Sequence, residues 1–161
     1  MERQVIKRLT MLGLISVFTL FAAVASASAQ LSTPIRAKIP FDFNIGQKKL
    51  PAGEYTFSPL SGLSDNKIMS VKNADASTNV LQSTFEAVAI TPKNHSILVF
   101  HKYADQYFLE QIWVSGELEG TQLPESRSER TARRQLAQTQ KNNTTGKAIK
   151  IDTVDVVASL F

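Results

Sequence analysis

Apolar and polar residues alternate over residues 35–44, where Ile, Ala, Ile, Phe and Phe occupy every second position. A period of two predicts a strand with one buried face. Pro40 cannot donate a hydrogen bond to a neighbouring strand, which favours an edge strand or a bulge at this point. A turn is expected at 50–53, where Pro and Gly supply the backbone angles of a tight turn, and the next strand at 54–58.

Further strand-like stretches are separated by segments rich in turn-forming residues. We expect strands at 68–71, 84–90, 96–103, 106–115 and about 148–160, and turns or loops at 44–49, 59–67, 72–78, 116–120 and 141–147. The alanine-rich composition of 84–90 leaves a short helix as an alternative there. Ala104 and Asp105 separate two aromatic strands, so a hairpin is expected, with a loop of two or three residues.

One helix is predicted at about 124–140, because no Gly or Pro interrupts this segment after its first residue. Pro124 suits a helix start, and Ser126 and Glu129 have the spacing of a capping box. Apolar positions are few, so most of the helix should lie at the surface. The whole pattern predicts a mainly β fold, an antiparallel β-sandwich or small open barrel with one C-terminal surface helix.

Large apolar side chains on the predicted strands are the candidates for the core, since each contributes about 1.5–3 kcal/mol when buried. The predicted core residues are Phe41, Phe43, Tyr55, Phe100, Phe108 and Trp113. We expect the aromatic hairpin to form the centre of this core.

The first 29 residues predict export. Arg3, Lys7 and Arg8 precede an apolar run without charges, and Ala27, Ser28 and Ala29 end it with small residues. This is the layout of a secretory signal peptide, with cleavage before Gln30. An uncleaved anchor is the alternative, although the run is shorter than the roughly 20 residues of a spanning helix. Residues 30–161 are then expected to form a single β-rich domain in the periplasm or outside the cell.

The amino-acid composition excludes several kinds of site and partner for the chain that remains after cleavage. The sequence has no cysteine, which excludes disulfides, thiol nucleophiles and cysteine metal sites. Residues 1–29 hold three of the 18 basic and one of the 14 acidic side chains, so the remainder carries +2. Residues 124–141 alone contribute +3. The basic character is therefore local, and nucleic acid is not an expected partner. After cleavage no apolar run approaches the length of a membrane span.

The histidines and clustered acids are weak candidates for chemistry. His95 and His101 could bind a metal with Asp105 or Glu110, but they are six residues apart and lack the spacing of a zinc site. The acids at 110, 117 and 119 are expected to form a solvated hairpin end rather than the carboxylate pair of a glycosidase. No nucleophile motif is found. We therefore assign no catalytic residue, metal or cofactor.

Arginines on the predicted helix are candidates for binding an anion. Arg127, Arg130 and Arg134 recur at spacings of three and four residues, which places them on one helix face. Such a face can bind lipid phosphate, acidic polysaccharide or an acidic protein. The alternative is a solvated face whose arginine stems cover apolar surface, with Glu125 and Glu129 balancing the first turn.

Four segments carry a resemblance to a protein family. These are IPFDF at 39–43, LPAGEY at 50–55, LVFHKY at 98–103 and LPES at 123–126. Their order resembles an uncharacterised family of small signal-peptide-bearing exported proteins of environmental bacteria. The resemblance implies a single domain over most of the mature chain and brings no catalytic or binding residue. We expect an exported, non-catalytic protein that binds an envelope or extracellular partner. A small hydrolytic or metal-dependent periplasmic enzyme and a structural envelope protein are the alternatives.

Overall fold

The computed structural model describes residues 34–60, 67–143 and 151–161. The predicted signal peptide at 1–29 and most of the predicted linker at 141–147 lie outside these ranges. The described strands are β1 (Ile35–Ile39), β2 (Phe43–Ile45), β3 (Lys48–Leu50), β4 (Gly53–Leu60), β5 (Lys67–Asn73), β6 (Asn79–Val88), β7 (Ser96–Tyr103), β8 (Gln106–Trp113), β9 (Glu119–Gln122) and β10 (Asp152–Leu160), and the described helix is α2 (Arg127–Asn143).

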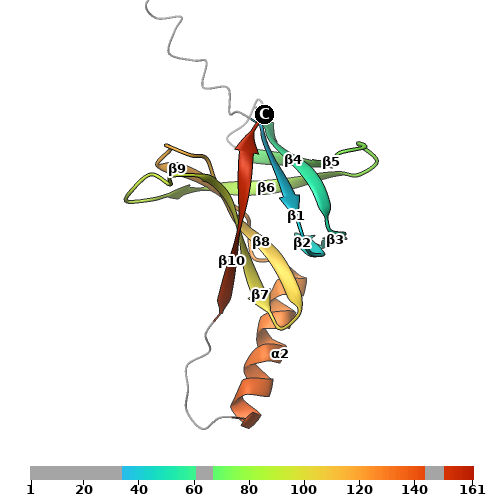
Figure 1. Ribbon diagram of the computed structural model, residues 1–161. Coiled ribbons are helices and arrows are strands. Elements are labelled where there is room, and N and C mark those ends of the chain that lie inside the picture. The colour runs from blue at the N-terminus through green and yellow to red at the C-terminus, as the bar shows by residue number, and fades with distance from the viewer. Residues whose placement is uncertain (1–33, 61–66, 144–150) are drawn as a thin grey trace, which may run out of the picture. The chain divides into compact units, whose positions relative to one another are not determined.

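Eight of these strands close into a barrel (Figure 1). Their order is β8-β7-β10-β1-β4-β5-β6-β9, and β9 returns to pair with β8, every pairing in the ring being antiparallel. The short β2–β3 hairpin is not one of the eight ring strands. Its strand β2 runs parallel to the first part of β8, and Phe43, Ile45 and Leu50 of the hairpin belong to the interior core. The predicted mainly β class with one C-terminal helix is therefore confirmed, and the sheet forms a closed ring.

Three short strands occupy segments that were predicted as turns or loops. The segment 44–49 contributes to β2 and β3, which meet at a turn where Gly46 has a positive φ of 57°. β9 begins at Glu119, inside the predicted loop at 116–120. The segment 84–88 is part of β6, and the helical alternative for this region is wrong.

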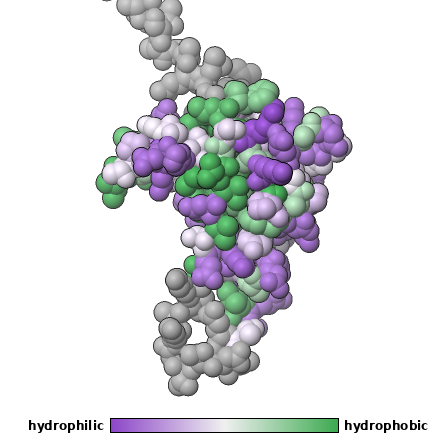
Figure 2. All heavy atoms as spheres, in the orientation of Figure 1, coloured by the Kyte–Doolittle hydropathy of each residue, from purple (hydrophilic) through white to green (hydrophobic). Residues whose placement is uncertain are grey.

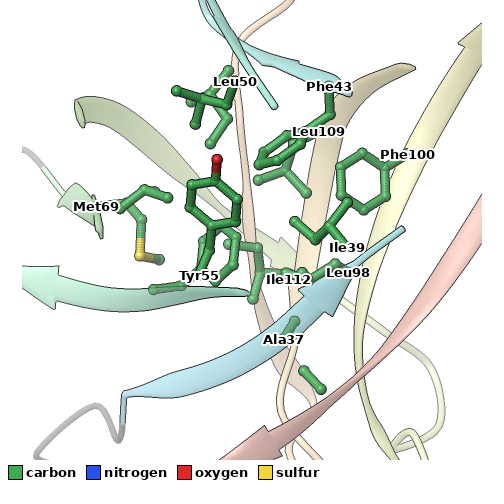
Figure 3. Packing of buried hydrophobic residues seen from close by; sticks show 14 of the residues in the cluster. Ala37, Ile39, Phe43, Leu50, Tyr55, Met69, Leu98, Phe100, Leu109 and Ile112 are labelled. Carbon is green, nitrogen blue, oxygen red and sulfur yellow. The ribbon is translucent and has the colours of Figure 1, made fainter. Parts of the chain in front are cut away.

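The interior of the ring is filled by side chains. Figure 2 shows that apolar residues also reach the outer surface in this view, whereas Figure 3 shows the interior side chains pointing toward one another. Phe43 packs edge-to-face against Tyr55 and Phe100, with ring centroids 5.1 and 5.6 Å apart. All three are buried. An eight-stranded barrel has an interior about wide enough for its own side chains, which these rings supply.

The other predicted core residues lie around this interior. Phe41 is half-buried and stacks on Tyr107, with ring centroids 3.9 Å apart. Phe108 is buried in a second, outer cluster. Trp113 is also buried. Its neighbour Ile112 points into the core, and adjacent strand residues point to opposite faces, so the Trp113 side chain lies on the outer face of the sheet.

Gly120 provides the place for the Trp113 ring. A Cβ at Gly120 would lie 2.5 Å from the Cε3 atom of the indole. Real Cβ contacts are longer, so only glycine lets the ring approach the β9 backbone this closely. The indole Nε1 donates to Gln111 Oε1 at 3.1 Å, which satisfies its polar atom.

A β-bulge interrupts the β7–β8 hairpin. Val99 is paired with Gln111 and Phe100 with Leu109, so Glu110 is an extra residue on β8. Beyond the bulge the hairpin ends in the two-residue loop Ala104–Asp105, since Tyr103 pairs with Gln106. The loop length that the sequence left open is therefore two.

Helix α2 begins one residue after its cap. The backbone N–H of Glu129 donates to Ser126 Oγ at 3.0 Å, which is the hydrogen bond of an N-cap serine. Arg127 is thus the first helical residue, and the helix starts later than Pro124. Ala132 and Leu136 pack on Tyr103 and Phe108 of the hairpin. In the part of the chain described here, no helix combines the length and apolarity that crossing a membrane requires.

Candidate functional site

His101 lies between two glutamates from different elements. Its Nε2 is 2.8 Å from Oε2 of Glu110 on β8, and its Nδ1 is 2.9 Å from Oε1 of Glu129 on α2. The hydroxyl of Tyr103 donates to the same Glu129 oxygen at 3.3 Å. We call these four residues the His101 cluster. They join the outer face of the hairpin to the first turn of the helix.

The fold positions each acid by a separate device. The bulge makes room for Glu110 as an extra residue, and bulges commonly re-aim a side chain in this way. The carbonyl of Glu110 accepts a hydrogen bond of 2.8 Å from the N–H of Leu123, which fixes the chain shortly before the helix. The Ser126 cap then starts the helical turn that carries Glu129 to the imidazole.

The two carboxylates favour the charged form of His101, although the cluster is mostly buried. The exposed fractions are 21% for the side chain of His101, 21% for that of Glu110 and 8% for that of Glu129. Hydrogen bonding to Glu129 raises the pKa of His101 above its usual 6.5, and burial partly opposes this. The negative charges of Glu110, Glu129 and Glu125 raise the pKa of the imidazole further. Both ring nitrogens face carboxylates, an arrangement that suits an imidazolium donating two hydrogen bonds.

Tyr103 acts in the cluster as a neutral donor. Burial is the first cause that raises the pKa of its hydroxyl, and the charge and hydrogen bond of Glu129 add to the effect. The hydroxyl therefore keeps its proton across the physiological pH range and continues to donate to Glu129.

The geometry does not suit a metal ion. The carboxylates of Glu110 and Glu129 bind opposite nitrogens of one ring, so the three side chains do not face a common point. Among the described residues, no group of three His, Cys, Asp or Glu side chains is arranged to hold a metal. The two carboxylates are also not arranged like the pair of a glycosidase, whose scissile bond lies between the two acids. Here the imidazole occupies that space.

The structure separates the two histidines. His95 is exposed and directly precedes β7. His101 lies within β7, six residues further along the chain. At about 3.3 Å per residue the two lie roughly 20 Å apart. Asp105, the other proposed partner, is exposed in the hairpin loop. Of the suggested combinations, the structure brings together only His101 and Glu110.

The predicted arginine face is partly neutralised. The carboxylate of Glu125 pairs with Nε of Arg130 at 3.5 Å and with Nε of Arg133 at 3.1 Å. Within the described ranges no ion pair involves Arg127 or Arg134, and both are exposed. The three arginines proposed to bind an anion thus differ, because Arg130 already has an acidic neighbour.

The end of β6 carries a second candidate site. Val88 is 73% exposed, Ile90 99% and Leu118 46%. The N–H of Ala89 donates to the carbonyl of Leu118 at 2.8 Å, and Val88 is paired with Glu119 on β9. We call Val88, Ile90 and Leu118 the apolar tip. β6 and β9 extend together to the left of Figure 1, and apolar spheres lie at the same extremity in Figure 2.

Hydrogen bonds between the two loops hold the apolar tip in place. The N–H of Gly116 donates to the carbonyl of Lys93 at 3.0 Å. The hydroxyl of Ser115 donates to the carbonyl of Asn94 at 2.9 Å. The acids Glu117 and Glu119 are exposed beside the tip, whereas Glu110, which was expected to form a solvated hairpin end with them, is mostly buried and pairs with His101.

Comparisons with protein-family models, with curated proteins and with solved structures return no match. The function must therefore be inferred from the two sites.

Sequence reasoning missed the partnership between His101 and Glu129. The spacing of Ser126 and Glu129 suggested that the Glu129 carboxylate would turn back to the helix start. The backbone half of that motif is present, but the carboxylate binds His101 and Tyr103. The apolar tip was also missed, although the run Ala-Val-Ala-Ile at 87–90 followed by loop residues was a visible signal.

Proposed function

We propose that this chain is an exported, non-catalytic barrel protein that binds an envelope or extracellular component through the apolar tip. The observation that carries the proposal is the exposure of three aliphatic side chains, Val88 at the end of β6 and Ile90 and Leu118 in the adjoining loops, which hydrogen bonds hold together. Proteins commonly expose single apolar residues, but several at one end of a strand pair mark an interaction site more often. Val88 is opposite Glu119 and Ala89 bonds to Leu118, so Val88 and Leu118 lie on opposite faces, and a partner would enclose the end of the pair.

Because the barrel interior is filled by side chains, we place the binding surface on the outside of the barrel. Its centre is occupied by buried aromatic and aliphatic side chains of the core. A partner would therefore contact the outside of the ring or the loops at its ends. Among the exposed large apolar residues, Ile90 is the most accessible, which favours the loop end that carries it.

The energy available at the apolar tip is sufficient for recognition. A partner that buries one aliphatic side chain gains about 1.5–3 kcal/mol from it. Two or three such side chains correspond to at least a hundredfold in affinity before the costs of association. The hydrogen bonds between the loops reduce the ordering cost, because the backbone at the tip is already fixed.

Two measurements test the proposal. Cell fractionation with N-terminal sequencing should recover the protein outside the cytoplasm with Gln30 as its first residue. Sedimentation of the purified domain with envelope fractions of the producing bacterium should then detect binding, which the triple change Val88→Ser, Ile90→Ser and Leu118→Ser should weaken at least tenfold.

A matched variant separates the tip from general surface apolarity. Leu60, Leu81 and Val157 are also exposed large apolar residues and lie away from the tip. Changing these three to Ser should leave sedimentation unchanged. Equal loss in both triple variants, or no binding by the parent protein, would contradict the assignment of the tip.

A further inference from the structure

We propose that His101 is a proton-dependent latch that holds α2 against the barrel as an imidazolium and lets the helix open more often when it is neutral. The latch concerns α2 and is independent of the binding function assigned to the apolar tip. It rests on the position of the imidazole between acids of two separate elements.

The latch connects the helix to the barrel through charged groups. Glu110 belongs to β8 and His101 to β7, so this pair is fixed within the barrel wall. Glu129 belongs to α2, and its carboxylate receives hydrogen bonds from His101 and Tyr103. The charged contact therefore crosses the boundary along which the helix would separate.

Among the described residues, few other side chains of α2 contact the barrel. Ala132 and Leu136 supply the apolar contacts with the hairpin. The hydroxyl of Ser128 donates to the carbonyl of Gly46 at 3.2 Å. These two side chains cover the buried rings of Tyr103 and Phe108, and this apolar contact does not depend on pH. The hydrogen bonds to Glu129 are therefore the part of the connection that a proton can change.

Loss of one proton weakens this connection directly. An imidazolium donates from both nitrogens, and each bond to a carboxylate is charge-assisted. A neutral imidazole donates from only one nitrogen. The other then directs a lone pair at a carboxylate 2.8 or 2.9 Å away, which is repulsive. In the tautomer that keeps its proton on Nε2, toward Glu110, the lone pair of Nδ1 points at Glu129, and opening of the helix relieves this repulsion by returning Glu129 to water.

The charged groups around His101 favour the protonated form. Glu125, which precedes the helix, adds negative charge. Its pairing with Arg130 and Arg133 tempers that effect. On β10 the residue opposite His101 is Thr153, and the nearest acid on the same face is Asp155, opposite Val99. Lys102 lies over the Tyr107 ring, on the other side of the β7 strand.

The sign of the pH effect follows from the raised pKa of His101. The stabilisation is fully present below the pKa that His101 has with the helix open, and it disappears as pH rises through the higher pKa of the closed state, in which Glu129 is also paired. Between these two values the opening constant of α2 rises by up to tenfold per pH unit, because closing binds up to one proton. Below and above that window the constant is flat.

Hydrogen exchange of the intact protein between pH 5.5 and 9 tests the latch. After correction for intrinsic exchange, the opening constant of amides in 130–139 should be flat at low pH, rise severalfold at higher pH and then become flat again. Amides of β7 and β10 should keep their protection. NMR titration of His101 in the same samples should place its pKa above the usual 6.5.

Three variants complete the test. His101→Gln should give an α2 opening constant that is raised and independent of pH. Glu110→Gln leaves the helix packing untouched and removes a negative charge that faces His101 whether the helix is closed or open, so the rise in the opening constant should move to lower pH. This variant keeps the test decisive if His101→Gln does not fold. His95→Gln, the matched control, should retain the parent profile. A flat profile in the parent, or a rise at the same pH in Glu110→Gln as in the parent, would overturn the latch.

Discussion

The interior of the barrel and the outer cluster beneath α2 are both buried, but different forces hold them. The interior gathers apolar side chains from strands around the whole ring. The outer cluster buries only Tyr103, Phe108 and Ala132, with Leu136 and Ile151 packed beside them. Next to these lies the charged contact between His101 and Glu129. Buried apolar area does not depend on pH, whereas the charged contact does.

This difference assigns separate roles to the two regions. Interior contacts are numerous, and each large side chain contributes about 1.5–3 kcal/mol. A hydrogen bond to a charged group contributes about 1.5–3 kcal/mol, but desolvation of the charges offsets part of it. The interior therefore sets the stability of the whole fold, and the outer cluster sets how firmly α2 is held.

The largest expected effect comes from removing interior or tightly packed rings. Phe100→Ala and Trp113→Ala should each lower the free energy of unfolding by about 3–5 kcal/mol, the range for large aromatic truncations. Denaturant titration at pH 6 and pH 9 measures both losses, which should be equal at the two pH values. Phe85→Ala is the control, since Phe85 is exposed. A loss below about 1 kcal/mol for Phe100→Ala would contradict the conclusion that the barrel interior sets the stability of the fold.

The next effect should depend on pH. His101→Gln keeps one donor but removes the charge, so we expect a loss of about 1–3 kcal/mol at pH 6. The raised pKa means that this loss is largest below pH 6.5 and shrinks as pH rises through the folded-state pKa. Denaturant titration of parent and variant at several pH values measures the difference. An equal loss at pH 6 and pH 9 would show that the charge contributes nothing.

A smaller effect is expected at the helix cap. Ser126→Ala removes the acceptor of the Glu129 N–H and should cost about 1 kcal/mol. Ser126→Asn or Asp should recover most of this loss, because both residues are good caps. The measurement is again denaturant unfolding, with far-UV circular dichroism to follow the helix. Failure of both replacements to recover stability would show that Ser126 matters through packing rather than capping.

Much of the fold follows from local sequence patterns. Alternation at 35–39 and the two aromatic strands around Ala104–Asp105 are found as strands in the structure. The β2, β3 and β9 strands were missed because three or four residues are too few to show a period. Closure of the ring depends on β9 meeting both β6 and β8, a tertiary pairing with no local signal.

The charged cluster illustrates why sites are harder to predict. Glu129 already had a local explanation as part of a capping box, so nothing in its neighbourhood indicated a second partner. His101 and Glu129 are 28 residues apart in sequence. The bulge at Glu110 depends on a register shift that alternation does not reveal. The sequence suggested that His101 and Glu110 could lie together, because they are close in the chain. That Glu129 of α2 is the second partner of His101 could be seen only in the structure.

The smallest effect is expected on the exposed face of α2. Changing Arg127, Arg130 and Arg134 together to Gln should alter the free energy of unfolding by less than about 0.5 kcal/mol, because these side chains are exposed and Gln is nearly as good a helix former as Arg. The ion pair of Arg130 with Glu125 is at the surface and contributes little. Denaturant titration measures the stability, and circular dichroism checks the helix.

The same triple variant tests whether this face binds anions. Sedimentation with vesicles of anionic phospholipid, at low and physiological ionic strength, compares it with the parent protein. We expect no salt-dependent binding by either, since Glu125 neutralises part of the charge and exposed contacts are screened over about 8 Å in physiological salt. Binding by the parent that falls with salt and disappears in the variant would instead make this helix face an anion-binding surface. The helix would then do more than cover the hairpin, and the contrast between a stable interior and a merely docked helix would need to be redrawn.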